Sequence, residues 1–273
     1  MPSARVEVDG VGFLSDEVAG QLRRRPGINR QLATVVTDTL RYANELATSL
    51  PVLTPPNTVD EKQRVISLVL FVRLIEIFEA VVVLAASGVR EEQRTLFRVF
   101  LDAYFLLANC CSDVGFFPVY FRSDQCERLK LMRAASRYND DLFATLNEYA
   151  TAEVKSGIEE RIKEESIQAF NSFVYAQNVG CEKIYDSMYR VCSSSVHSAP
   201  RCLENYVQTD VAGNIVGVLH REDSEATNRV LYDCEGFFLK GIHGILELFE
   251  SQELTFVTRF EAALEAAGHE TKP

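Results

Sequence analysis

Apolar residues along this chain recur mostly at helical spacing, in long segments separated by proline, glycine or clusters of polar residues. Apolar side chains three and four positions apart lie on one face of an α-helix, so these segments predict amphipathic or buried helices. The pattern predicts helices over residues 28–50, 58–87, 91–111, 123–149, 152–169, 181–197 and 224–249, the last of which can extend to residue 267. The expected fold is therefore all-α, a bundle of about six or seven helices.

Two segments depart from the helical pattern. Residues 1–27 hold only short apolar patches and the basic run Arg23–Pro26, and we expect an N-terminal arm with a short strand at Arg5–Val8. Residues 28–273 are expected to form a single helical domain. Within it, residues 205–219 contain two β-prone runs that flank a Gly-Asn pair, which is typical of a hairpin or an extended loop.

The two most apolar helices are predicted to pack as an antiparallel pair. Thr58 stands three residues before Glu61, as in a capping box that begins a helix, and Gly88 is a natural C-terminal stop. Both helices approach the length of a membrane span, yet each charge at a bilayer centre costs roughly 2.5–3.5 kcal/mol. Charges near their centres are Arg73, Glu76, Glu79, Arg98 and Asp102. We therefore expect a buried hairpin of a soluble protein and no membrane partner.

The charges inside this apolar hairpin need partners, because an unpaired buried charge costs several kcal/mol. Arg98 and Asp102 are four residues apart, so they lie on one helix face and can pair. Glu76 and Arg73 of the preceding helix could join them. These residues either form an ionic network that holds the two helices in register, or Asp102 or Glu76 lines a pocket with a shifted pKa.

A second polar cluster lies in the segment YRVCSSSVHSAP, residues 189–200. At about 100° per residue, a core stripe forms on one side of the predicted helix. It comprises Cys181, Tyr185, Met188 and Cys192. The opposite side carries Asp186, Arg190, Ser193 and His197, and Tyr189 lies between the two. A histidine at a helix C-terminus also interacts well with the helix dipole, and serines there can satisfy free backbone groups. No nucleophile elbow surrounds Ser193, which disfavours a Ser–His nucleophile pair.

Composition narrows the class of protein. The formal net charge of −11 over 273 residues disfavours a binder of duplex DNA, which needs a basic surface. Seven cysteines without a CxxC pair and four scattered histidines predict neither a disulfide framework nor a metal site, and no cofactor is expected. The N-terminus lacks the pattern of a signal peptide, so the cytoplasm is the expected compartment.

Two segments together resemble an uncharacterised helical family, domain of unknown function 5677. They are LFVRLIEIFEAVVVLAASGVREEQRTLFRVFLDAYFLLANCCSD and YDSMYRVCSSSVHSAP. The family carries an Arg followed four residues later by an acid, here Arg98 and Asp102, where Asp replaces the usual Glu. It also carries a Tyr, a Ser and a His at intervals of four, here Tyr189, Ser193 and His197. The resemblance covers roughly residues 60–250 and implies no activity.

A more distant similarity concerns the spacing Arg190-x6-His197, which resembles the R-x4–6-H pattern of helical HEPN ribonucleases. That resemblance implies a metal-independent endoribonuclease of defence or toxin type, with RNA as partner and a homodimer as assembly. Arg190 would hold the phosphate and His197 would act as general acid or base, with Tyr189 and Ser193 orienting them. Arg98 and Asp102 would be supporting charges. The alternative is a non-catalytic interaction or small-ligand-binding module whose polar residues form a structural network.

Overall fold

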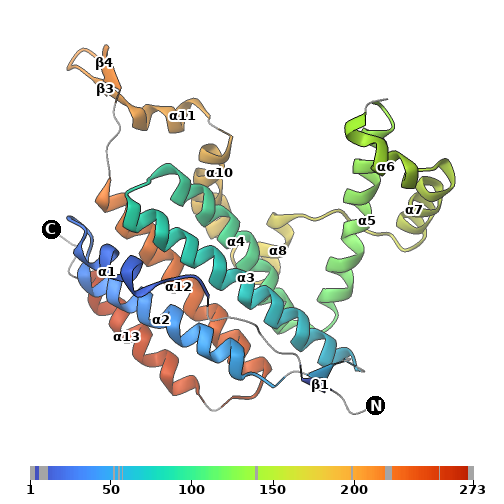
Figure 1. Cartoon of the computed structure of the whole chain (residues 1–273), viewed down its shortest axis with the longest axis horizontal. Coiled ribbons are helices and arrows are strands. Elements are labelled where there is room, and N and C mark those ends of the chain that lie inside the picture. Colours follow the sequence, from blue (N-terminus) through green and yellow to red (C-terminus); the bar gives the residue numbers. More distant parts are fainter. Residues whose placement is uncertain are drawn as a thin grey trace. The chain divides into compact units, whose positions relative to one another are not determined.

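The computed structural model describes residues 4–5, 12–51, 53–54, 56, 58–138, 141–197, 199–218, 223–251 and 253–269. Most of it is helical, which confirms the all-α prediction (Figure 1). Contacts group the chain into two compact units, residues 1–112 with 175–273, and residues 113–174. The sequence predicts one domain over residues 28–273, whereas the contacts of 113–174 are concentrated within that segment.

The first unit is built around α3 (Val59–Ser87), α4 (Glu91–Ser112) and α12 (Ser224–Leu248), which pack on one another. Aromatic side chains fill the space between these three helices. The ring of Phe78 lies 5.2 Å from that of Phe238 and 5.7 Å from that of Phe100. Burial of such large apolar side chains supplies most of the driving force for folding.

The start and end of α3 are those that the sequence predicts. Thr58 Oγ1 accepts a hydrogen bond from the Glu61 amide, and the Glu61 carboxylate accepts one from the Thr58 amide, so the capping box is complete. Gly88 has φ 78°, in the left-handed region that glycine tolerates best, and its amide bonds back to Ala85. The tight turn brings α4 back along α3.

Helix α1 (Asp16–Arg24) was not predicted. Residues expected to form an irregular arm contain α1, which Ser15 caps at its N-terminus. Ala19 and Leu22 of α1 are fully buried against the bundle. Two apolar residues three positions apart are a weak indication of a helix in the sequence. They are enough to hold α1 in place once α2 and α3 provide an apolar surface on which it packs. The predicted strand overlaps β1 (Ala4–Arg5), which pairs with β2 (Leu53–Thr54); its remainder lies outside the described residues.

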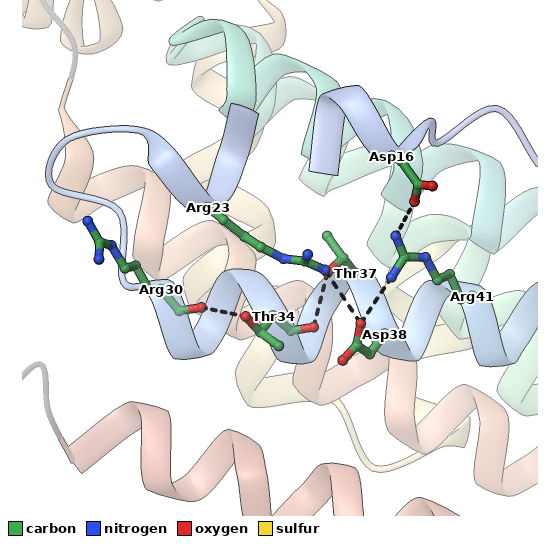
Figure 2. Close-up of polar contacts among 7 residues, drawn as sticks. All are labelled: Asp16, Arg23, Arg30, Thr34, Thr37, Asp38 and Arg41. Carbon is green, nitrogen blue, oxygen red and sulfur yellow. Dashed lines mark hydrogen bonds and ion pairs between the residues drawn. The ribbon is translucent and has the colours of Figure 1, made fainter. Parts of the chain in front are cut away.

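Polar contacts hold α1 on α2 (Arg30–Ser49), as Figure 2 shows. Arg23 donates through Nη2 to Thr37 Oγ1 at 2.6 Å and approaches the Asp38 carboxylate at 3.5 Å. Arg41 bridges back to α1 by pairing with both Asp38 and Asp16. The basic run near the N-terminus therefore contributes Arg23 to the packing of two helices.

The second unit departs from the predicted single helix over residues 123–149. α5 spans Phe116–Ala135, and a short 3₁₀ turn (Asp141–Phe143) precedes α6 (Ala144–Tyr149). The predicted start was wrong because Pro118 lies in the first turn of α5, where the missing amide hydrogen costs nothing. α7 (Ala152–Glu164) confirms the charged amphipathic helix.

The chain then returns to the first unit through a series of short elements. They are α8 (Ser172–Asn178), α9 (Glu182–Ile184), the π-helical turn η2 (Tyr185–Tyr189), α10 (Arg190–Val196), α11 (Pro200–Leu203), the 3₁₀ turn η3 (Glu204–Tyr206), β3 (Val207–Thr209) and β4 (Ile215–Val218). The antiparallel pairing of β3 with β4 confirms the predicted hairpin. The last predicted helix is divided, because α12 ends before α13 (Leu254–His269) begins.

By length and composition, α4 could cross a membrane, and it is the one such helix within the described ranges. In this structure, 56% of the most apolar 18-residue stretch of α4 is buried, and the core helix of a soluble protein has the same length and composition.

Candidate functional site

The helix that carries the Tyr–Arg–Ser–His segment contains a π turn, which changes its helical phase. Residues 182–196 form one continuous helix, but Tyr185–Tyr189 adopt π geometry, which inserts an extra residue into the turn. Tyr189, expected between the two faces, is only 4% exposed, and its ring stacks on that of Tyr185 at 4.5 Å. Uniform rotation of 100° per residue could not predict this inward position.

Tyr189 and Ser193 meet the charged pair of α4. Arg98 donates through Nη2 to Tyr189 Oη at 2.7 Å and through Nε to Ser193 Oγ at 3.3 Å. Its Nη1 lies 3.7 Å from Asp102 Oδ2, and Tyr189 Oη lies 3.4 Å from the same oxygen. We call these four residues the α4–α10 clamp. It joins positions that the family resemblance singles out from segments about ninety residues apart.

The clamp lacks the two α3 residues that the sequence proposes for it. Arg73 and Glu76 are both exposed, and neither forms an ion pair with a described residue. They share a narrow outward strip of α3 with Val69, which is also exposed, while the rest of the helix is largely buried. The sequence of an almost uniformly apolar helix does not indicate which strip faces solvent. The prediction that Arg73 and Glu76 join the network of Arg98 and Asp102 was therefore wrong.

Arg190 and His197 lie at the surface. Arg190 Nε pairs with Asp186 Oδ1 at 3.0 Å, with both side chains more than half exposed, and its guanidinium lies over the Tyr185 ring. His197 is exposed just beyond α10, and none of the described residues hydrogen-bonds to its side chain. The predicted common face thus divides, because Ser193 turns toward Arg98 while Asp186 and Arg190 pair in solvent.

A second polar cluster, at the start of α4, was missed by the sequence reasoning. The buried carboxylate of Glu91 accepts hydrogen bonds at 3.0–3.2 Å from Arg90, Arg94, Ser195 and Asn205. We call this cluster the Glu91 hub. Arg90, Arg94 and Arg98 recur at intervals of four, and this spacing could have indicated a charged helix face. Nothing in the sequence connects Asn205 with Glu91. The hub ties the base of the hairpin to α4.

An open hollow of about 420 Å³ lies beside the Glu91 hub. Its walls include Glu92 and Thr95 of α4, Leu203 of α11, Tyr206 and Val218. Glu92 is exposed and has no hydrogen-bond or ion-pair partner among the described residues. Burial raises the pKa of the Tyr206 hydroxyl, and the negative charges of Glu92 and Glu91 raise it further. The hollow therefore combines apolar walls with an unpaired carboxylate.

A smaller hollow of about 270 Å³ lies between α4 and α12. Its walls include Cys111 and the pair His243–Glu247, whose Nδ1 and Oε2 are 3.5 Å apart. Burial raises the pKa of the Cys111 thiol to about 12, so at neutral pH it is not a thiolate nucleophile. Across the residues with described side chains, no three His, Cys, Asp or Glu side chains gather as metal ligands.

The model of a family of unknown function, DUF5677, matches residues 64–215, which is more than half of the chain. This protein belongs to the DUF5677 family. Among curated proteins and among solved structures, nothing matches it.

The DUF5677 match covers most of α3 and every element from α4 to the first residue of β4. Every residue of the α4–α10 clamp and of the Glu91 hub falls within it. α2, α12 and α13 lie outside the match and complete the core around it. The DUF5677 segment thus contains both of these polar clusters, while the flanking helices contribute apolar packing together with the α1–α2 contacts of Arg23 and Arg41.

Proposed function

We propose that this protein is a non-catalytic interaction module, in which the α4–α10 clamp is a structural network that holds α10 and the hairpin on the helical core. The observation that carries this proposal is that every guanidinium nitrogen of Arg98 lies next to a polar side chain of the same protein. Its three nitrogens meet Tyr189, Ser193 and Asp102, and its side chain is largely buried.

A group that binds or transforms a substrate must present free donors or acceptors to it. Arg98 and Tyr189 direct their polar atoms at each other, and the thiol of Cys111 is held protonated. Among the described residues that line the hollow beside the Glu91 hub, the Glu92 carboxylate has no hydrogen-bond or ion-pair partner, an arrangement that favours recognition over catalysis.

The test is an RNA cleavage assay combined with unfolding. Purified protein is incubated with labelled single-stranded RNA in EDTA, beside His197→Ala and Arg190→Ala. We expect the same background cleavage from all three proteins, while Arg98→Met lowers the free energy of unfolding. Cleavage by the wild type that both surface variants abolish would overturn the proposal.

The second candidate is a HEPN-like, metal-independent endoribonuclease with RNA as partner and a homodimer as assembly. It is favoured by the exposure of Arg190 and His197, since both side chains are accessible to a phosphate and a 2′-hydroxyl. Arg190 would have to leave Asp186 to bind phosphate, at the small cost of an exposed ion pair. The same assay decides between the two candidates.

A further inference from the structure

The β3–β4 hairpin has open edges that carry neither a charged side chain nor a proline, and its register shift lies between Gln208 and Thr209 of β3. It is a two-stranded sheet, and in the described chain no third strand pairs with either outer edge. Neither strand carries a charged side chain, since β3 reads VQT and β4 reads IVGV. Ile215 and Val218 are 69% and 82% exposed. Proteins commonly guard exposed edges with charges or proline, so an uncharged apolar edge is a template for another strand.

The hollow beside the Glu91 hub continues this surface from β4 to α4. Val218 belongs to both, and Leu203, about half exposed, forms a second apolar wall. Arg90 and Arg94 approach from the Glu91 side, but their guanidinium groups are held by the Glu91 carboxylate. The charge that remains unpaired in the hollow is that of Glu92, and no Lys or Arg is among the lining residues.

We propose that this surface binds an extended peptide segment of a partner protein. The segment adds as a strand to the edge of the β3–β4 hairpin, places a Lys or Arg side chain at Glu92, and rests an apolar side chain between Leu203 and Val218. Strand addition supplies main-chain hydrogen bonds, and pockets for alternate side chains supply specificity. This inference rests on the proposed interaction function, whose partner class it names.

The charge of the protein and the small area of the hairpin edge favour a basic peptide over a second copy of the chain. A protein with net charge −11 attracts basic segments, and the hollow offers a carboxylate in an otherwise apolar setting. A second copy of the chain fits less well, because strands of three and four residues cannot supply the roughly 800 Å² per partner of a stable interface. A peptide needs only one edge and one pocket.

The experiment selects short random peptides displayed on phage against the intact wild-type protein, with counter-selection on Glu92→Lys. We expect enriched peptides to carry Lys or Arg flanked by apolar, β-branched residues. The best peptide is synthesised and its Kd measured by fluorescence anisotropy. Glu92→Lys should weaken binding at least about tenfold, and Val216→Lys on the strand should also weaken it.

The matched control is Glu45→Lys, an exposed acid of α2 with the same change of charge. It should bind the peptide as the wild type does. Selection without enrichment of basic residues, or equal loss of affinity in Glu45→Lys and Glu92→Lys, would overturn the inference. Selected peptides that bind elsewhere would leave the interaction function standing and sink only this site. A concentration-dependent dimer that Val216→Lys abolishes would assign the edge to a second copy instead.

Discussion

The guanidinium of Arg98 on α4 donates a 2.7 Å hydrogen bond to the phenolic oxygen of Tyr189, the buried last residue of a π turn. This bond links the apolar helical hairpin to the segment that leads to α11 and the β3–β4 hairpin. A hydrogen bond with one charged partner contributes about 1.5–3 kcal/mol, more than a neutral one. Its loss should therefore be measurable in the stability of the whole first unit.

Replacing Tyr189 by Phe removes the hydroxyl that meets both Arg98 and Asp102. We expect the free energy of unfolding to fall by about 1–2 kcal/mol, because two partly buried charged groups lose a hydrogen-bond partner. Urea denaturation followed by circular dichroism measures it. Tyr149→Phe, at an exposed tyrosine, is the matched control and should change stability by less than about 0.5 kcal/mol. Equal effects of the two variants would contradict the role of the clamp.

Arg98→Met and Arg73→Met compare two arginines that both lie within apolar helical segments of the sequence. Arg98 has three partners in the clamp, whereas Arg73 is exposed on α3. We expect Arg98→Met to cost about 2 kcal/mol, since it leaves Asp102 without its cation, and Arg73→Met to cost little. Thermal and urea unfolding of both variants check the difference. A larger loss in Arg73→Met would show that α3 does supply the network.

Glu235 of α12 is fully buried, and burial raises its pKa from 4.5 to about 8, with partial opposition from the Thr39 hydroxyl. The folded protein thus keeps a proton that the unfolded chain releases between these two values. The unfolded state is therefore favoured as pH rises through that window, and the contribution of Glu235 to stability declines.

Glu235→Gln removes this titration. The Tm of the variant minus that of the wild type should increase from about pH 5 to about pH 8 and then level off. Differential scanning calorimetry at several pH values measures it, with Glu225→Gln, at an exposed glutamate of the same helix, as control. A difference in Tm that stays constant across this range would refute the buried acid as its source.

Glu91→Gln is expected to loosen the base of the hairpin. The Gln side chain lacks the charge that holds Arg90 and Arg94, and it cannot accept the present set of four hydrogen bonds. Amide hydrogen exchange over residues 203–218 should accelerate at least about tenfold, while exchange in the core of α12 stays slow. Glu92→Gln, one residue further and exposed, serves as control. Unchanged protection in Glu91→Gln would show that Asn205 is anchored by other contacts.

Local signals along the sequence predicted the elements whose determinants lie within a few residues. Thr58 and Glu61 predicted the start of α3 and Gly88 its end, and two short β-prone runs on either side of residues 212–214 predicted a hairpin or an extended loop, which is the β3–β4 hairpin. The pairing of Arg98 with Asp102 followed from their spacing of four. Pro118 misled because a proline in the first turn of a helix resembles one that ends it.

The tertiary structure alone decided which polar residues meet. Tyr189 reaches Arg98 because a π turn rotates it inward, Glu91 gathers donors from α10 and from Asn205, and Arg73 and Glu76 remain on the solvent strip of α3. Helical periodicity defines faces of a single helix but carries no information about the surface that each face will meet. That choice depends on the packing of α3, α4 and α12, where burial of many apolar side chains outweighs the placement of any one charge.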